Sequence, residues 1–234
     1  MKRGWIGLAA AFAAWLAQPA AQADGAPDLK SRGRSVAIIS AMGNRIYFQP
    51  ENVSLFYADG VPSRVLSGGD LDGAAIQAAT ETLRADMPEA GVVTAAIPRD
   101  QLLSAANEVY RTDPGAVEAV MATVKAWREA NTADLVIVLM PIESSLADRP
   151  NTRRFFGMGV TWNEGAVLMQ AIVLDGKTGE VLAGATARAL SPLGAHITTA
   201  AFLDTSPEST KGLTDYIRGM LANTVPGLLR NAGL

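Results

Sequence analysis

The chain contains no cysteine and only one histidine among its 234 residues. Without cysteine there is no disulfide and no thiolate, so the fold depends on its hydrophobic core. A zinc site would need His196 together with carboxylates alone, which is an uncommon ligand set. These absences exclude cysteine-based catalysis and the common structural zinc sites.

Motifs for catalysis and cofactor binding are also lacking. No Gly-x-Ser-x-Gly sequence marks a hydrolase nucleophile. The turn Ser67-Gly68-Gly69-Asp70 precedes a predicted helix, but it lacks the lysine of a phosphate-binding loop and the spacing of a dinucleotide fingerprint. The carboxylates Asp70, Asp72, Glu143 and Glu164 are scattered, and the sequence pairs none of them. We therefore expect no metal and no cofactor.

Long hydrophobic runs are missing apart from one, at the very start. Lys2 and Arg3 precede an apolar run from Trp5 to Ala17, and Ala21-Gln22-Ala23 has the small-x-small pattern that signal peptidase recognises. The run is shorter than the roughly 20 residues that span a membrane, and no lipid-accepting cysteine follows it. Residues 1–23 are thus predicted to be a cleavable signal peptide, with Asp24 as the first residue of a periplasmic or secreted protein.

The mature chain lacks a basic excess. Loss of Lys2 and Arg3 leaves 18 basic residues against 23 acidic ones, a net charge of −5. Nucleic acids and anionic membranes favour a basic surface, so neither is an expected partner of the chain as a whole. The remaining length suits one buried core. We predict a flexible lead-in over residues 24–34 and a single domain over residues 35–234, with the oligomeric state left open.

Alternating strand and helix patterns predict an α/β (α+β) domain with a mixed sheet. The first part reads strand–helix–strand–helix–strand, with an aromatic hairpin at 45–48 and 53–57 after the first strand. Predicted strands cover residues 36–40, 91–97 and 134–142, and the first two are expected to be buried strands. Predicted helices cover residues 70–87, 99–107 and 113–130. The run at 134–142 is continuously apolar, which is typical of a central strand covered on both faces.

The second part of the chain changes to short strands joined by glycine-containing turns. Strands at 158–162, 166–174 and 180–189 predict an antiparallel meander. A closing helix is predicted over residues 209–231, with its apolar positions on one side and a kink at Pro226. No internal repeat and no long linker divides the chain.

Three segments together resemble the periplasmic α/β domains of Gram-negative envelope proteins. They are Ser35-Val36-Ala37-Ile38-Ile39, Ala133 to Leu139, and the hairpin Val173-Leu174-Asp175-Gly176-Lys177-Thr178-Gly179-Glu180-Val181-Leu182. Such domains occur in the curli-secretion lipoprotein, the outer-membrane activators of peptidoglycan synthases and the N-terminal part of the Tol propeller protein. The resemblance implies a structural hairpin and a role in binding other envelope proteins. Two features depart from it, the missing lipid-anchor cysteine and the extra aromatic hairpin.

One segment stands out as a candidate binding site. Arg149, Arg153 and Arg154 form a cationic loop in an acidic protein, and Phe155 and Phe156 follow directly. Arginine and aromatic side chains are enriched at interface hot spots. The simpler alternative is that the arginines are solvated and that the aromatic residues, Tyr47, Phe48, Phe56, Tyr57 and Trp162 included, pack a β layer.

The sequence favours a periplasmic, non-enzymatic binding or adaptor protein whose partner is an envelope protein or an anionic surface. A hydrolase with its site near Glu143, Ser144 and His196 is the alternative, because sites in α/β proteins often lie at the carboxyl ends of central strands. A small-ligand carrier would instead have an apolar pocket lined by the aromatic hairpin.

Overall fold

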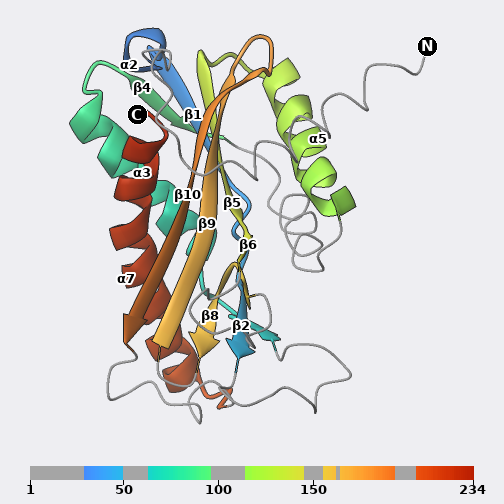
Figure 1. Cartoon of the computed structure of the whole chain (residues 1–234), viewed down its shortest axis with the longest axis vertical. Coiled ribbons are helices and arrows are strands. Elements are labelled where there is room, and N and C mark those ends of the chain that lie inside the picture. Colours follow the sequence, from blue (N-terminus) through green and yellow to red (C-terminus); the bar gives the residue numbers. More distant parts are fainter. Residues whose placement is uncertain (1–28, 50–62, 96–113, 145–154, 162–163, 193–203) are drawn as a thin grey trace.

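The computed structural model describes six stretches of the chain: residues 29–49, 63–95, 114–144, 155–161, 164–192 and 204–234 (Figure 1). The predicted signal peptide and the predicted helix at 99–107 lie outside them. Their elements form one mixed eight-stranded sheet with helices on both faces. The predicted fold class is therefore confirmed.

Strand β5 (Leu135–Pro141) is the central strand that its apolar sequence predicts. It pairs in parallel with β1 (Ser35–Ser40) and antiparallel with β9 (Glu164–Asp175). Every residue of β5 is buried. Its alternate side chains enter two different core clusters, one on each face: Leu135, Ile137 and Leu139 in the first, and Val136, Val138 and Met140 in the second.

Strand β9 is long enough to join two halves of the sheet. Along one edge its second part pairs with β5, and its first part pairs with β8 (Met158–Thr161). Beyond β5 lie β1 and β4 (Gly91–Thr94), and beyond β8 lie β2 (Arg45–Gln49) and β3 (Ser63–Val65). The other edge of β9 pairs along its length with β10 (Val181–Pro192). The predicted meander β8–β9–β10 is confirmed, with β9 and β10 each reaching beyond the expected ends.

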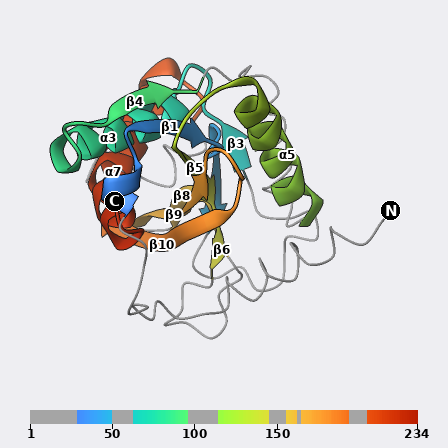
Figure 2. The same cartoon turned by 90° about the horizontal axis from the view of Figure 1, so that it is seen from above.

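Two helices cover one face of the sheet and a third covers the other (Figure 2). Helix α3 (Leu71–Asp86) and helix α7 (Pro207–Asn231) pack on the larger core cluster, and α5 (Pro114–Ala130) packs on the smaller one through Val120 and Val124. An ion pair at 2.9 Å joins Arg230 to Asp86, so the carboxyl ends of α7 and α3 lie together. The two helices therefore run in parallel, and α7 continues through Pro226.

Three predictions change in detail. The strand predicted at 91–97 is described as Gly91–Thr94, but it is an edge strand, and Val93 is 49% exposed. The predicted flexible lead-in is helical from Leu29 to Arg32 (α2), because Leu29 is buried in the main core. In the predicted hairpin the described antiparallel partner of β2 is β3, and residues 53–57 lie outside the described stretches.

Candidate functional site

The structure brings two sets of predicted site residues together in one small ladder. Strand β6 (Glu143–Ser144) pairs antiparallel with β7 (Phe155–Phe156), so that Glu143 lies opposite Phe156 and Ser144 opposite Phe155. The two backbone segments that bound the cationic loop are thus side by side. Arg149, Arg153, Arg154 and His196 themselves lie outside the described residues.

The β6–β7 ladder rises where β9 changes partner from β5 to β8. Ile142 donates its backbone N–H to the carbonyl of Leu168 at 3.2 Å, and Leu168 donates to Gly157 at 2.7 Å. Gly157 donates back to Ile142 at 3.0 Å and has a φ of 65°, which glycine adopts without strain. This closed set of bonds fixes both ends of the ladder to the main sheet.

A small apolar cluster lies at the same junction. Ala166 and Leu168 of β9 are fully buried, and Ile142 and Tyr47 pack against them. Burial raises the pKa of the Tyr47 hydroxyl well above its usual value, although the charge of nearby Arg45 opposes this shift. Phe48 is 4% exposed and belongs to the main core. The two described residues of the predicted aromatic hairpin are therefore packing residues, as the simpler alternative expects.

A shallow groove of about 700 Å³ follows the seam between α3 and α7. Small residues form much of its lining, among them Gly73, Ala74 and Ala78 of α3 and Gly219 and Ala222 of α7. The groove was not predicted from the sequence, although small residues recur at helical spacing in both segments. The groove does not include the residues of the aromatic hairpin, so it is not the pocket expected for a small-ligand carrier.

Charged side chains flank this groove at both ends. Asp70 caps α3 by accepting a hydrogen bond from the Gly73 backbone at 2.9 Å, and Arg230 pairs with Asp86 at the other end. The Nε of Arg218 is buried without a hydrogen-bond partner among the described residues. Because the other charged groups at its ends hold the helices, the groove has mainly the character of a helix–helix seam.

A buried polar cluster occupies the carboxyl end of β1, a place where α/β proteins often bind ligands. Ser40 donates to Asp72 at 2.5 Å, and the Gly43 backbone donates to the same carboxylate oxygen at 3.2 Å. Asn44 accepts from the Leu71 backbone at 3.2 Å. Ser40 is 1% exposed and Asp72 is 8% exposed. A serine that solvent does not reach is a poor nucleophile for a substrate, so the cluster ties the β1–β2 connection to α3.

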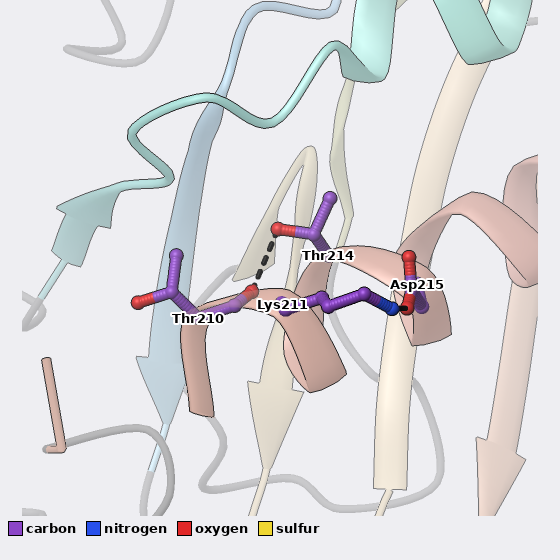
Figure 3. A network of polar contacts seen from close by, with 4 residues as sticks. All are labelled: Thr210, Lys211, Thr214 and Asp215. Carbon is purple, nitrogen blue, oxygen red and sulfur yellow. Dashed lines mark hydrogen bonds and ion pairs between the residues drawn. The ribbon is translucent and has the colours of Figure 1, made fainter. Parts of the chain in front are cut away.

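The start of α7 is held by polar contacts (Figure 3). Thr214 donates its hydroxyl to the carbonyl of Thr210 at 2.7 Å, and Lys211 bonds Asp215 at 2.5 Å. The hydrogen bond from Lys211 lowers the pKa of the exposed Asp215 carboxyl. From β3, Arg64 donates to the Thr210 hydroxyl at 3.0 Å. The first two contacts lie within the helix, and the bond from Arg64 joins the helix to the sheet.

Further along α7, Tyr216 fastens the helix to the open end of the β9–β10 hairpin. Its hydroxyl accepts from the Gly165 backbone at 3.1 Å and donates to the Ser191 carbonyl at 2.7 Å. Gly165 and Ser191 are register partners, so the hydroxyl bridges a backbone pair. A Cβ at Gly165 would collide with the Tyr216 ring, which explains the glycine.

The described stretches contain neither a cluster of metal ligands nor a membrane-spanning helix. No group of three or more histidine, cysteine, aspartate or glutamate residues is placed to hold a metal ion there. None of the helices described is both long enough and apolar enough to cross a membrane.

Comparison with known proteins gives structural likenesses only. No protein-family model matches the chain, and no curated protein matches it. Similar solved structures include the PelC dodecamer from Paraburkholderia phytofirmans, with 14% identity and a TM-score of 0.35, covering 86% of this chain and 89% of that one. Lipoprotein GNA1162 from Neisseria meningitidis has 11% identity and a TM-score of 0.30, covering 81% and 98%.

The C-terminal domain of LpoB from Salmonella enterica is also similar, with 15% identity and a TM-score of 0.27, covering 72% of this chain and 87% of that one.

Proposed function

We propose that the protein is an exported, non-enzymatic binding protein of the cell envelope that docks an anionic partner through the loop carrying Arg149, Arg153 and Arg154. Export rests on the signal-peptide pattern of the first 23 residues. A cleaved product without a lipid anchor is periplasmic or secreted, and the resemblance of three sequence segments to envelope domains favours the periplasm.

The observation that carries this proposal is the β6–β7 ladder at the base of the loop. Ser144 and Phe155 pair, so the ten residues between them leave and re-enter the structure at one place. The bonds among Ile142, Gly157 and Leu168 join that place to a buried sheet. A loop on a rigid scaffold is a common location for binding residues.

The charge of the loop supports an anionic partner. Three arginines lie within six positions of a mature chain whose net charge is −5. Guanidinium groups bind carboxylates and phosphates through paired hydrogen bonds, which an ammonium group does not reproduce. Phe155 and Phe156 follow these charges directly in the sequence, and aromatic side chains are enriched with arginine at interface hot spots. The partner is thus an acidic envelope protein or a phosphate-bearing surface of the envelope.

The test is reversal of the three charges in the Arg149→Glu, Arg153→Glu and Arg154→Glu variant. A matched control reverses Lys30, Arg32 and Arg34, which are exposed and lie close together in the sequence. Both variants change the charge by the same amount, so a general electrostatic effect would weaken both. We expect only the loop variant to lose its partner, with the melting temperature unchanged, because exposed charges contribute little to stability.

Two binding measurements separate the two kinds of partner. Sedimentation with phosphatidylglycerol vesicles reports a phosphate-bearing surface, and cross-linking in periplasmic extract followed by mass spectrometry reports an acidic protein. If the loop variant and the wild type bind equally in both measurements, the proposal is wrong.

A further inference from the structure

Strand β10 has a long edge with no described partner. It spans twelve residues, and among the described stretches it pairs only with β9. Helix α7 contacts the strand, and the alanines at positions 183, 185, 187 and 189 pack on the main core. Natural proteins protect such edges, because the unpaired N–H and C=O groups are a template for another strand.

The backbone hydrogen bonds of β9 show which backbone groups of β10 point outward. Leu168 and Gly176 donate away from β10, to Gly157 and Asp134 respectively, and Asp175 donates toward it, to Glu180. Because antiparallel strands alternate the direction of their backbone groups, the odd-numbered residues of β9 bond β10. Their register partners on β10 are also odd-numbered, as in the pair Ala171 and Ala185. Beyond the register shift between Val181 and Ala183, the even-numbered residues of β10 therefore present their N–H and C=O groups to the outer edge.

Within the described part of the chain, the outer edge of β10 has few of the features that prevent pairing with another strand. Thr186 and Arg188 are exposed, and Leu190 is 41% exposed. Lysine is absent from the strand, proline occurs only at its last residue, and the only register shift lies between Val181 and Ala183. From Ala183 to Pro192 the strand continues without a further register shift.

The sequence of this edge is almost a palindrome. Residues 182–190 read Leu-Ala-Gly-Ala-Thr-Ala-Arg-Ala-Leu, which is symmetric about Thr186 except for Gly184 and Arg188. An antiparallel strand centred on the same residue would place leucine opposite leucine and alanine opposite alanine. Each Arg188 would lie opposite a glycine, which leaves space for the long side chain and keeps the two like charges apart.

We infer that β10 is a self-association edge, and that its occupant is β10 of a second copy of this chain, paired antiparallel about a two-fold axis at Thr186. The two sheets then form one continuous sheet. The outward backbone groups come from Gly184, Thr186, Arg188 and Leu190, and the symmetry uses the same surface on both copies. The residues of this interface are different from those of the proposed cationic loop, which lies between β6 and β7 in the sequence.

The absence of native cysteine allows a direct test by single-cysteine cross-linking of the mature protein. In the proposed register Thr186→Cys lies opposite its own copy, with Cα atoms about 5.5 Å apart, within the range that a disulfide spans. The matched control, Arg188→Cys, lies four residues from its copy, about 13 Å along the strand. Mild oxidation should give a covalent dimer from Thr186→Cys and none from Arg188→Cys.

A charge-swap experiment tests the same axis without a covalent bond. Thr186→Lys and Thr186→Glu each place like charges opposite one another, so each variant alone should be monomeric by light scattering, whereas wild type has the mass of two chains. An equimolar mixture of the two should recover the dimer, because the opposed charges are then of opposite sign. Recovery also shows that both variants fold. Val93→Lys on the edge strand β4 is the control and should stay dimeric.

The inference would be overturned if wild type were monomeric by light scattering over a range of protein concentrations. It would also be overturned if Thr186→Lys and Thr186→Glu each remained dimeric alone. Cross-linking of Arg188→Cys as efficiently as Thr186→Cys would also overturn it, because it would exclude this register. Binding to the anionic partner through the arginine loop is measured separately and does not depend on these outcomes.

Discussion

Replacing Val138 by aspartate is expected to destabilise the protein severely. Val138 is fully buried at the middle of β5, and its register partners are Ile39 on β1 and Ile172 on β9. All three belong to the core cluster beneath α5. Neighbouring strands lie on both sides and a helix covers this face, so an introduced carboxylate has no route to solvent.

The magnitude follows from two contributions. Loss of the buried valine side chain costs about 1.5–3 kcal/mol in transfer free energy. An unpaired buried carboxyl group adds several kcal/mol more, and it becomes protonated rather than remain charged. The sum is comparable with the roughly 5–15 kcal/mol that stabilises a typical domain. Val138→Ala, which creates only a small cavity, should cost about 2 kcal/mol at roughly 0.8 kcal/mol for each buried methylene removed, plus the cavity.

The pH dependence distinguishes a buried carboxyl group from a general packing defect. Burial raises the pKa of an aspartate in the folded state above its unfolded value of about 3.9. The folded state therefore keeps a proton that the unfolded state loses, and the penalty grows as the pH rises above about 4. Val138→Asn carries no such group, so its penalty should not change with pH.

Urea unfolding at pH 3.5 and pH 7 measures both effects, with each variant compared with wild type at the same pH. The Val138→Asp penalty should be clearly larger at pH 7, and the Val138→Asn penalty should be equal at the two values. An unfolding free energy for Val138→Asp within about 1 kcal/mol of wild type at pH 7 would refute the placement of this residue in a central strand.

Two smaller predictions concern the hydrogen bonds of Tyr216 and the first residue of the exported protein. Tyr216→Phe removes the hydroxyl that bridges the Gly165 N–H and the Ser191 carbonyl, so urea unfolding should show a loss of about 1–3 kcal/mol; an unchanged midpoint would show that the bridge contributes nothing. Mass spectrometry of the exported protein should give Asp24 as the first residue without lipid, and a mature fraction that retains Met1 would contradict the predicted cleavage.

The order of the elements could be predicted from the sequence, because apolar periodicity reports burial directly. The continuous apolar run of β5 predicted a central strand, and the helical spacing of Val120 and Val124 predicted α5. The strand at Gly91 was predicted to be buried, but β4 lies at an edge. A short apolar run reports strand propensity, whereas the chain crossovers decide the strand order.

Contacts between distant segments could not be predicted in this way. Tyr216 and Gly165 are 51 residues apart, and nothing in either local sequence indicates that a hydroxyl bridges a backbone pair. The pairing of β6 with β7 could not be predicted from the sequence either, because two-residue strands have no periodicity. The near-palindrome at 182–190 is visible in the sequence, but its meaning depends on knowing that β10 is an edge strand.

The salt dependence of partner binding tests the proposed function most directly. Mature wild type and the Arg149→Glu, Arg153→Glu, Arg154→Glu variant are titrated against the captured partner, or against phosphatidylglycerol vesicles, from low salt to about 0.5 M. Exposed charges are screened beyond roughly 8 Å at physiological ionic strength, so wild-type affinity should fall steeply with salt and the variant should bind weakly at every concentration. Wild-type binding that is independent of salt, or equal in the variant, would contradict an electrostatic docking loop.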